Sequence, residues 1–343
     1  MLVSAVLDPY ALDFDDAYFD DLYMINAEDL LKGVKKNGVL IVDSGKKLQN
    51  ALRDRIKSQA FPMKYQKRLQ ILVEELLKNK KRRIVECPVA PNSTSSSNLL
   101  GIACDLKTDT EADGLIVGNN SFEALRFNPK YSDGIVPLSE YRDSGFEKER
   151  QRYCDGLGPI DMLSRSEVDE IVIRSIRFSK WLRFYDRYIA IANNTSDFLN
   201  GIKYILSLWR DHSFFASRQG MGEVVIFTGV EHIREDEEDH VKESKLARRQ
   251  ESYRKVKREL MGWLKREAPQ WWQIKIFVKD DPDHIFHARY LETQHAIIRI
   301  DRGFDLFNQK NGFQRNFFTL NMAEATHLRE CRDLPDADLD GMS

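Results

Sequence analysis

Two short apolar segments that each end near an aspartate, LVSAVLD at residues 2–8 and GVLIVDS at residues 38–44, indicate the fold of the first half of this chain. Neither alternates polar and apolar residues, so both faces of each segment are expected to be buried. Amphipathic helical patterns follow at residues 46–58 and 67–79, and further apolar strand patterns precede residue 120. Buried strands separated by helices predict an α/β domain with a mostly parallel sheet.

The α/β pattern restarts in the second half of the chain. Residues 168–178, VDEIVIRSIRF, are apolar enough to predict a strand, and an amphipathic helix is predicted at residues 198–212. A buried type of strand follows at residues 222–230, then a long charged helix at residues 235–268 and several more strands. We therefore predict a second α/β domain, with a mixed sheet and flanking helices.

The segment between the two patterns, residues 128–158, is polar and shows little periodicity, which is typical of a connection between domains. The predicted domains are residues 1–160, including this connector, and residues 161–330. Residues 331–343 end in DLPDADLDGMS and are expected to be a loose acidic tail.

Composition favours a soluble protein of the cytoplasm. The chain has 343 residues, of which 42% are hydrophobic and 31% charged, and its net charge of −2 excludes a general polycation. Its cysteines form no C-x-x-C pair, which argues against a zinc knuckle or disulfide framework and suits a reducing compartment. No apolar run is long enough for a membrane span, and the amino terminus lacks the basic start of a signal peptide.

Acidic residues follow the strand patterns of the first domain. Ligands of open α/β sheets bind beyond the carboxyl ends of the strands, and carboxylate oxygens are the ligands that Mg²⁺ and Mn²⁺ prefer. We therefore predict a Mg²⁺ or Mn²⁺ site that would support phosphodiester cleavage. Its predicted ligands are Asp8, Asp43, Asp105 and Asp113.

This arrangement resembles a PIN-type nuclease domain, with Asp8 in AVLD and Asp113 in ADGLIV matching the metal-binding acids of that family. The resemblance implies that these two residues are catalytic. The basic tract at residues 45–83 begins with Lys46 and Lys47, which are predicted to neutralise phosphates of a nucleic acid. The alternative is that Asp8 caps a turn with Pro9 and that the later acids form a solvated loop.

A second candidate site lies in HARYLET, residues 287–293, and DRGFDLF, residues 301–307. Residues two apart in a strand point to the same face, so His287 and Arg289 are expected to project together. Arginine binds phosphate oxygens through paired hydrogen bonds, and histidine can attack a phosphodiester. Arg289, Arg302 and Asp305 are therefore predicted to form a phosphate site, with His287 as a candidate catalytic residue.

These motifs, with YDRYIAI at residues 185–191, resemble the phospholipase-D-like carboxy-terminal domain of microtubule-interacting-and-trafficking proteins and their bacterial relatives, over residues 170–322. The family's closest members bind rather than cleave. This chain has one His-x-basic motif, in which Ala288 lies between the histidine and the arginine. Position 294 is glutamine, whereas the active phospholipase D motif has aspartate there. Binding is therefore favoured over catalysis at His287.

The two resemblances together predict a cytoplasmic, metal-dependent nuclease whose second domain recognises phosphate, nucleic acid or a protein partner. Such a protein would suit a prokaryotic phage-defence or toxin-like effector. Two alternatives remain. One is a module that binds phosphate ligands or partners without cleaving, and the other is a metal-independent phosphodiesterase that works as a homodimer through His287. The sequence does not distinguish DNA from RNA.

Overall fold

The computed structural model divides the chain into two compact units, unit 1 at Met1–Asp155 and unit 2 at Gly156–Ser343. The division lies close to the predicted boundary at residue 160. Each unit is an α/β domain. The structure describes residues 2–13, 21–58, 63–78, 80–89, 98–130, 134–154, 158–189, 195–230, 233–234, 236–286, 289–307, 312–320 and 325–337.

Unit 1 contains a five-stranded sheet in the order β3-β2-β1-β4-β5. Every neighbouring pair is parallel, which confirms the prediction of a mostly parallel sheet. All residues of the central strands β1, β2 and β4 are buried, as their continuous apolar runs indicated. The strands are β1 (Val3–Leu7), β2 (Gly38–Asp43), β3 (Ile84–Cys87), β4 (Gly114–Val117) and β5 (Ile135–Pro137).

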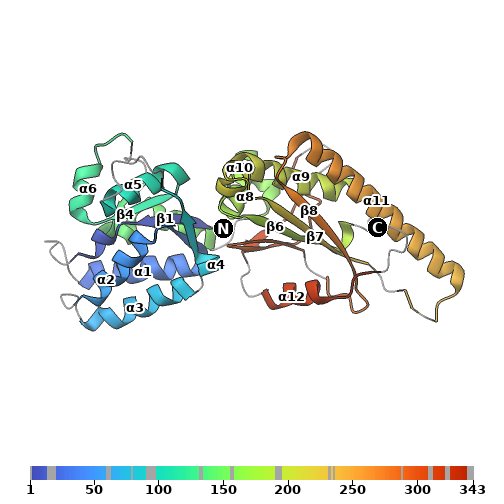
Figure 1. Cartoon of the computed structure of the whole chain (residues 1–343), viewed down its shortest axis with the longest axis horizontal. Coiled ribbons are helices and arrows are strands. Elements are labelled where there is room, and N and C mark those ends of the chain that lie inside the picture. The colour runs from blue at the N-terminus through green and yellow to red at the C-terminus, as the bar shows by residue number, and fades with distance from the viewer. Residues whose placement is uncertain are drawn as a thin grey trace. The chain divides into compact units, whose positions relative to one another are not determined.

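Helices cover both faces of this sheet, with α1 and α3 on one side and α5 and α6 on the other (Figure 1). In chain order, β2 and β3 extend the sheet on one side of β1, and β4 and β5 extend it on the other side. Ligands of such folds bind beyond the carboxyl ends of the strands, at the point where the order changes side. The helices of unit 1 are η1 (Pro9–Leu12), α1 (Asp21–Asn37), α2 (Lys47–Lys57), α3 (Met63–Lys78), α4 (Lys80–Arg83), α5 (Leu99–Thr110), α6 (Asn119–Leu125), η2 (Leu138–Asp143) and α7 (Gly145–Cys154).

Most of the segment predicted as a connector, residues 128–158, belongs to unit 1, which extends to Asp155. It contributes edge strand β5 and helix α7, which contacts α1. The Arg150 guanidinium donates to the Glu147 carboxylate at 2.6 Å and to the Asn37 side chain at 2.7 Å, and all three residues are buried. The sequence showed little periodicity here because polar side chains hold this segment in place.

Unit 2 contains a six-stranded mixed sheet in the order β11-β10-β9-β6-β7-β8. Strands β6, β7 and β8 are parallel, whereas β9, β10 and β11 each run antiparallel to their neighbour, which confirms the predicted mixed sheet. The strands are β6 (Trp181–Tyr185), β7 (Glu223–Val230), β8 (Gln273–Asp280), β9 (Tyr290–Thr293), β10 (Ile297–Ile300) and β11 (Phe318–Leu320).

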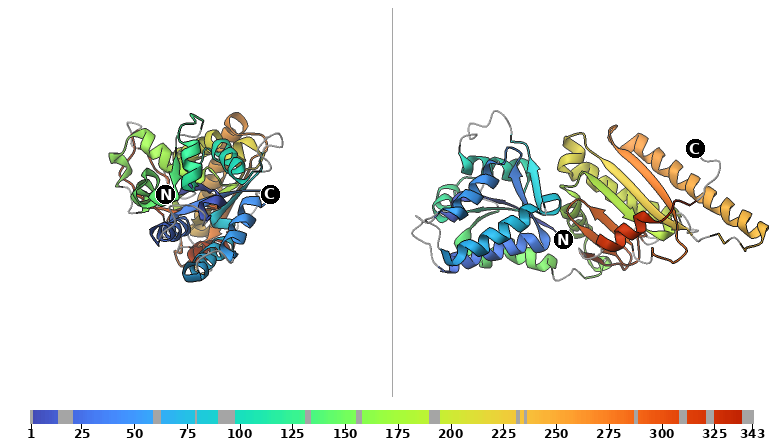
Figure 2. Two further views of the ribbon diagram at one scale, coloured as in Figure 1. Left: turned by 90° about the vertical axis from the view of Figure 1, so that its left-hand side faces the viewer. Right: turned by 60° about the horizontal axis from the view of Figure 1, so that its bottom comes forward.

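Most helices of unit 2 lie on one face of its sheet, and α12 lies on the other face (Figures 1 and 2). Among the described residues, no helix is both long enough and apolar enough to cross a membrane. The helices are η3 (Ile160–Met162), α8 (Arg165–Ile176), η4 (Arg187–Ile189), α9 (Thr195–His212), α10 (Phe214–Arg218), α11 (Asp239–Glu267) and α12 (Ala325–Asp333).

The strand predicted at residues 168–178 is wrong, because these residues lie mostly in helix α8. Ser164 and Glu167 form a reciprocal capping box at its amino terminus. Val168, Ile171 and Val172 are buried at helical spacing. The S-x-x-E pattern of Ser164 and Glu167 is a helix-start signal that the prediction from apolar content overlooked.

The acidic tail predicted at residues 331–343 is packed up to Ala337, the last residue that the structure describes there. Cys331, in α12, is 1% exposed and belongs to a core cluster with Tyr185 and Phe227. Ala337 donates its backbone N–H to the Val278 carbonyl at 2.8 Å and so extends the pairing of β8. Backbone pairing therefore orders a segment that its composition marked as loose.

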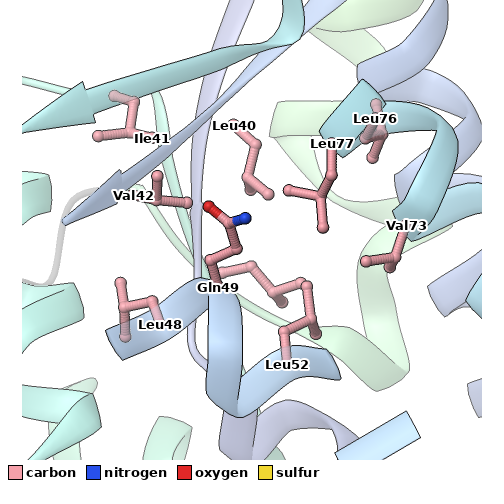
Figure 3. Close-up of a pocket in the computed structure, with 10 residues that line it drawn as sticks. Leu40, Ile41, Val42, Leu48, Gln49, Leu52, Val73, Leu76 and Leu77 are labelled. Atoms are coloured by element: carbon pink, nitrogen blue, oxygen red, sulfur yellow. The ribbon is translucent and has the colours of Figure 1, made fainter. Parts of the chain in front are cut away.

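Among the buried polar atoms of unit 1 without a hydrogen-bond partner is Oε1 of Gln49. The Gln49 side chain of α2 lies among leucines of β2, α2 and α3 (Figure 3). Its residue is 6% exposed, and Oε1 accepts no hydrogen bond. The adjoining cavity of about 10 Å³ is at the lower limit for a single water molecule.

Gln49→Met should therefore raise the free energy of unfolding of unit 1 by about 1 kcal/mol, because it replaces an unsatisfied carboxamide with an apolar side chain of similar length. Chemical denaturation of the full chain measures the change. Asn50→Met, at the neighbouring exposed position of α2, is the matched control and should change stability little. A loss of stability in Gln49→Met would contradict this account of the site.

Candidate functional sites

Asp8 lies immediately after β1, at the carboxyl edge of the unit 1 sheet. Its residue is fully buried, and its carboxylate accepts the backbone N–H of Tyr10 at 3.1 Å and the Ser121 hydroxyl at 3.4 Å. Asp8 caps η1, which confirms the interpretation of Asp8 as a turn cap. Burial raises the pKa of Asp8 from 3.8 to about 6, against the hydrogen bonds and nearby Arg55, which lower it.

Asp43 lies after β2 at the same edge and is also buried. Its two carboxylate oxygens accept the backbone N–H groups of Lys47 at 2.9 Å and Leu48 at 2.8 Å. Asp43 therefore caps the amino terminus of α2, which satisfies otherwise unpaired N–H groups of that helix. The side chains of Lys46 and Lys47 are exposed beside this cap, where they remain candidates for contact with phosphate.

The prediction that Asp113 joins Asp8 in one site is wrong. Asp113 precedes β4, and the parallel register places Gly114 opposite Ala5. Its carboxylate accepts the backbone N–H of Ser4 at 2.7 Å and the Ser4 hydroxyl at 2.8 Å. Asp113 therefore ties the amino-terminal ends of β1 and β4 together, at the opposite edge of the sheet from Asp8.

The predicted metal ligands as a set do not fit a divalent ion. Asp105 lies within α5 and is half-buried, and Asp43 has both oxygens engaged as a helix cap. In the described part of the chain, no three histidine, cysteine or acidic side chains are grouped so that they could hold a metal ion. The carboxyl edge therefore offers two buried carboxyl groups, Asp8 and Asp43, and Asp43 has both oxygens engaged in capping α2.

In unit 2, the structure brings Arg289 and the 301–305 turn together around a buried carboxylate that sequence reasoning did not single out, Asp186. Asp186 follows β6 and accepts the backbone N–H groups of Tyr188 at 2.9 Å and Phe304 at 3.3 Å. Gly303, with φ of +78°, leaves no room for a Cβ atom, which would clash with the Asp186 carboxylate.

Arg289 is held by three different contacts. Its Nη1 donates to the Asp301 carbonyl at 2.8 Å, its Nε lies 3.9 Å from Oδ1 of Asp186, and its guanidinium lies 4.9 Å from the centre of the Tyr188 ring. The Nε atom makes no hydrogen bond. Burial raises the pKa of Asp186 to about 6, although its backbone hydrogen bonds and Arg289 lower it. Arg289 is thus fixed in place, with its Nε atom buried beside the Asp186 carboxylate.

The remaining residues of the predicted phosphate site lie on the same turn. Arg302 is exposed, and its backbone N–H donates to the Asn316 side chain at 3.0 Å, while Asp305 is half-buried. Asn316 is fully buried and also donates to the Gly303 carbonyl at 3.1 Å, which fixes the turn. His287 lies outside the described residues, so its predicted role stays a prediction.

Two further arginines adjoin this site and were missed by sequence reasoning. Arg187 follows Asp186, and Arg315 precedes Asn316. Within the part of the chain that the structure describes, the guanidinium groups of Arg187, Arg302 and Arg315 make no hydrogen bond or ion pair. Only the tertiary contacts of Asp186 and Asn316 reveal that these arginines share one region with Arg289.

Comparison with known proteins does not add a family to these sites. No family model, no curated protein and no solved structure matches this chain. The resemblances drawn from the short motifs therefore stay predictions, and the function must be argued from the two sites themselves.

The raised pKa of Asp8 predicts a pH dependence of stability. Its folded pKa of about 6 exceeds the ordinary value of 3.8, so the fold favours the protonated form. Protonated Asp8 therefore contributes its full stabilisation below pH 3.8, and this contribution is lost as the pH rises through 6. The free energy of unfolding should fall by about 3 kcal/mol from this source by pH 7.5.

Asp8→Asn should therefore gain stability relative to the wild type between pH 4 and pH 7.5, as measured by denaturation at both values. The exposed Asp54→Asn is the control and should differ from the wild type equally at the two pH values. A wild-type minus Asp8→Asn difference that does not change with pH would refute the assignment.

Proposed function

We propose that this protein binds the phosphate groups of nucleic acid through unit 2, at a site made by Arg289 and the 301–305 turn. The observation that carries this proposal is that Arg289 and the turn converge on Asp186, although twelve residues of sequence separate Arg289 from Asp301. The proposed role is recognition rather than cleavage.

The geometry around Arg289 supports a ligand oxygen in this position. A guanidinium binds phosphate best when its plane is fixed in advance, because less conformational entropy is then lost on binding. The Tyr188 ring and the Asp301 carbonyl hold Arg289 in this way.

Charge supports the same ligand. Arg289 contacts the turn, Arg302 belongs to it, and Arg187 and Arg315 are the sequence neighbours of Asp186 and Asn316, which hydrogen bond to it. Asp301 of the turn is already paired with Arg299 at 3.3 Å. Asp186 and Asp305 offset part of this charge, and the arginines remain in excess. An excess of arginine with exposed guanidinium groups is the electrostatic signature of phosphate recognition.

A second candidate function is phosphodiester cleavage at the carboxyl edge of unit 1, in a cytoplasmic, defence-type effector. The observation that favours it is Asp8, a buried carboxyl group at the ligand-binding edge with a pKa of about 6. Such a group can accept or donate a proton near neutral pH. Lys46 and Lys47 at the start of α2 would contact the substrate phosphates.

Arg302→Gln and Arg315→Gln should each weaken binding of a fluorescently labelled single-stranded RNA or DNA, because each removes one cation from the proposed phosphate site. Each should also lower the slope of log affinity against log salt by about 1. Fluorescence anisotropy between 50 and 200 mM NaCl measures both quantities.

Arg266→Gln, at an exposed position near the end of α11, is the matched control and should leave the affinity and the slope unchanged. Equal effects of all three substitutions would indicate only general electrostatic attraction. Wild-type protein that binds neither RNA nor DNA would contradict the proposed function.

Cleavage is tested by incubating labelled DNA and RNA with the full chain in Mg²⁺, Mn²⁺ or EDTA. If unit 1 cleaves, Asp8→Asn should lower the rate by at least about a hundredfold, as loss of a general acid or base does. The exposed Asp109→Asn should retain activity. If His287→Ala abolishes cleavage and Asp8→Asn does not, the cleavage activity belongs to unit 2. If the wild type binds nucleic acid without cleaving it, recognition remains the proposed function.

A further inference from the structure

Unit 1 has a cavity of about 440 Å³ at the carboxyl ends of β4 and β5, beside the amino-terminal end of α1. Its volume falls within the range of small-molecule sites. Neither the predicted metal site nor the proposed phosphate site includes it. The lining residues are Leu22, Tyr23, Asn119, Phe122, Glu123, Arg126, Pro137, Ser139 and Glu140.

The walls of this cavity combine apolar and aromatic side chains with polar and charged ones. Tyr23 is 2% exposed and donates its hydroxyl to the Ala11 carbonyl at 2.5 Å, so its ring is fixed in place. Phe122 is half-buried on α6, and Pro137 closes the end of β5. Asn119 and Ser139 hydrogen bond to each other at 2.7 Å and join the ends of the two strands. The cavity is therefore built on rigid elements.

The charges of the lining residues favour a cation. Arg126 is paired with Glu123 at 2.7 Å, so these two side chains neutralise each other. Glu140 is exposed and forms no ion pair in the described part of the chain. The lining therefore has an excess of negative charge. Asp8 lies nearby, because its carboxylate accepts the hydroxyl of Ser121, the residue before Phe122.

We propose that this cavity binds a small organic cation, an amine with an apolar or aromatic body. Aromatic rings attract cations through their negative faces, and a carboxylate adds a charge-assisted hydrogen bond. Glu140 supplies the carboxylate, and the half-buried Phe122 supplies aromatic surface. An anionic ligand would meet the same carboxylate and is excluded by repulsion. This site does not depend on the phosphate-binding function proposed for unit 2.

The test uses three probes with the same ring and different charge: benzylamine, benzyl alcohol and benzoate. Isothermal titration of the full chain should show saturable binding of benzylamine, weaker binding of benzyl alcohol and no binding of benzoate. Glu140→Gln should weaken benzylamine binding about fivefold, the effect of one charge at contact distance. The exposed Asp54→Asn is the matched control and should bind benzylamine as the wild type does.

Arg126→Gln gives the sharper result, because it removes the partner of Glu123 and so adds a second unpaired carboxylate to the cavity. It should strengthen benzylamine binding, again about fivefold, whereas an anion site would respond in the opposite direction. Circular dichroism checks that each variant is folded. Absence of benzylamine binding to the wild type, preference for benzoate, or weaker benzylamine binding in folded Arg126→Gln would each overturn the proposal.

Discussion

The parallel register of β1 and β4 is the constraint that decides what unit 1 can do. Because both strands run in the same direction, the residue before β4 and the residue after β1 lie at opposite edges of the sheet. Asp113 therefore binds Ser4 at the amino edge, while Asp8 lies at the carboxyl edge. Of the predicted acids, Asp8 and Asp43 lie at the edge where ligands bind, and Asp43 is engaged in capping α2, so the predicted cluster of acids does not form.

The two units have the same local arrangement of an aspartate, a tyrosine and an arginine at the end of a central strand. Asp8 and Asp186 each follow such a strand, are fully buried, and accept the backbone N–H of a tyrosine two residues later. In each unit an arginine lies over that tyrosine ring, at 4.3 Å for Arg55 and 4.9 Å for Arg289. Burial raises both aspartate pKa values to about 6. Each strand-end aspartate thus accepts a backbone hydrogen bond that fixes the following turn, and its burial also raises its pKa towards neutral pH.

The charged residues around these two aspartates differ, and this difference is the reason for proposing different ligands for the two units. Gly303 brings the backbone of its turn against Asp186, which places Arg302 beside Arg289. Arginines outnumber carboxylates there, so the site suits an anion. At the carboxyl edge of unit 1, the cavity at the ends of β4 and β5 carries Glu140 as its unpaired charge, and the same reasoning favours a cation.

Apolar periodicity in the amino-acid sequence was enough to predict two α/β units, the parallel sheet of unit 1 and the four helices α2, α3, α9 and α11, because burial of one face or of whole strands leaves a direct pattern. It failed for α8, for β5 with α7, and for α12, where a capping box, a buried Glu147–Arg150 pair and backbone pairing stabilise the elements. Strand-end aspartates were visible in the sequence, but which of them share an edge was not. That depends on strand order, strand direction and register, which arise from contacts between residues far apart in the chain.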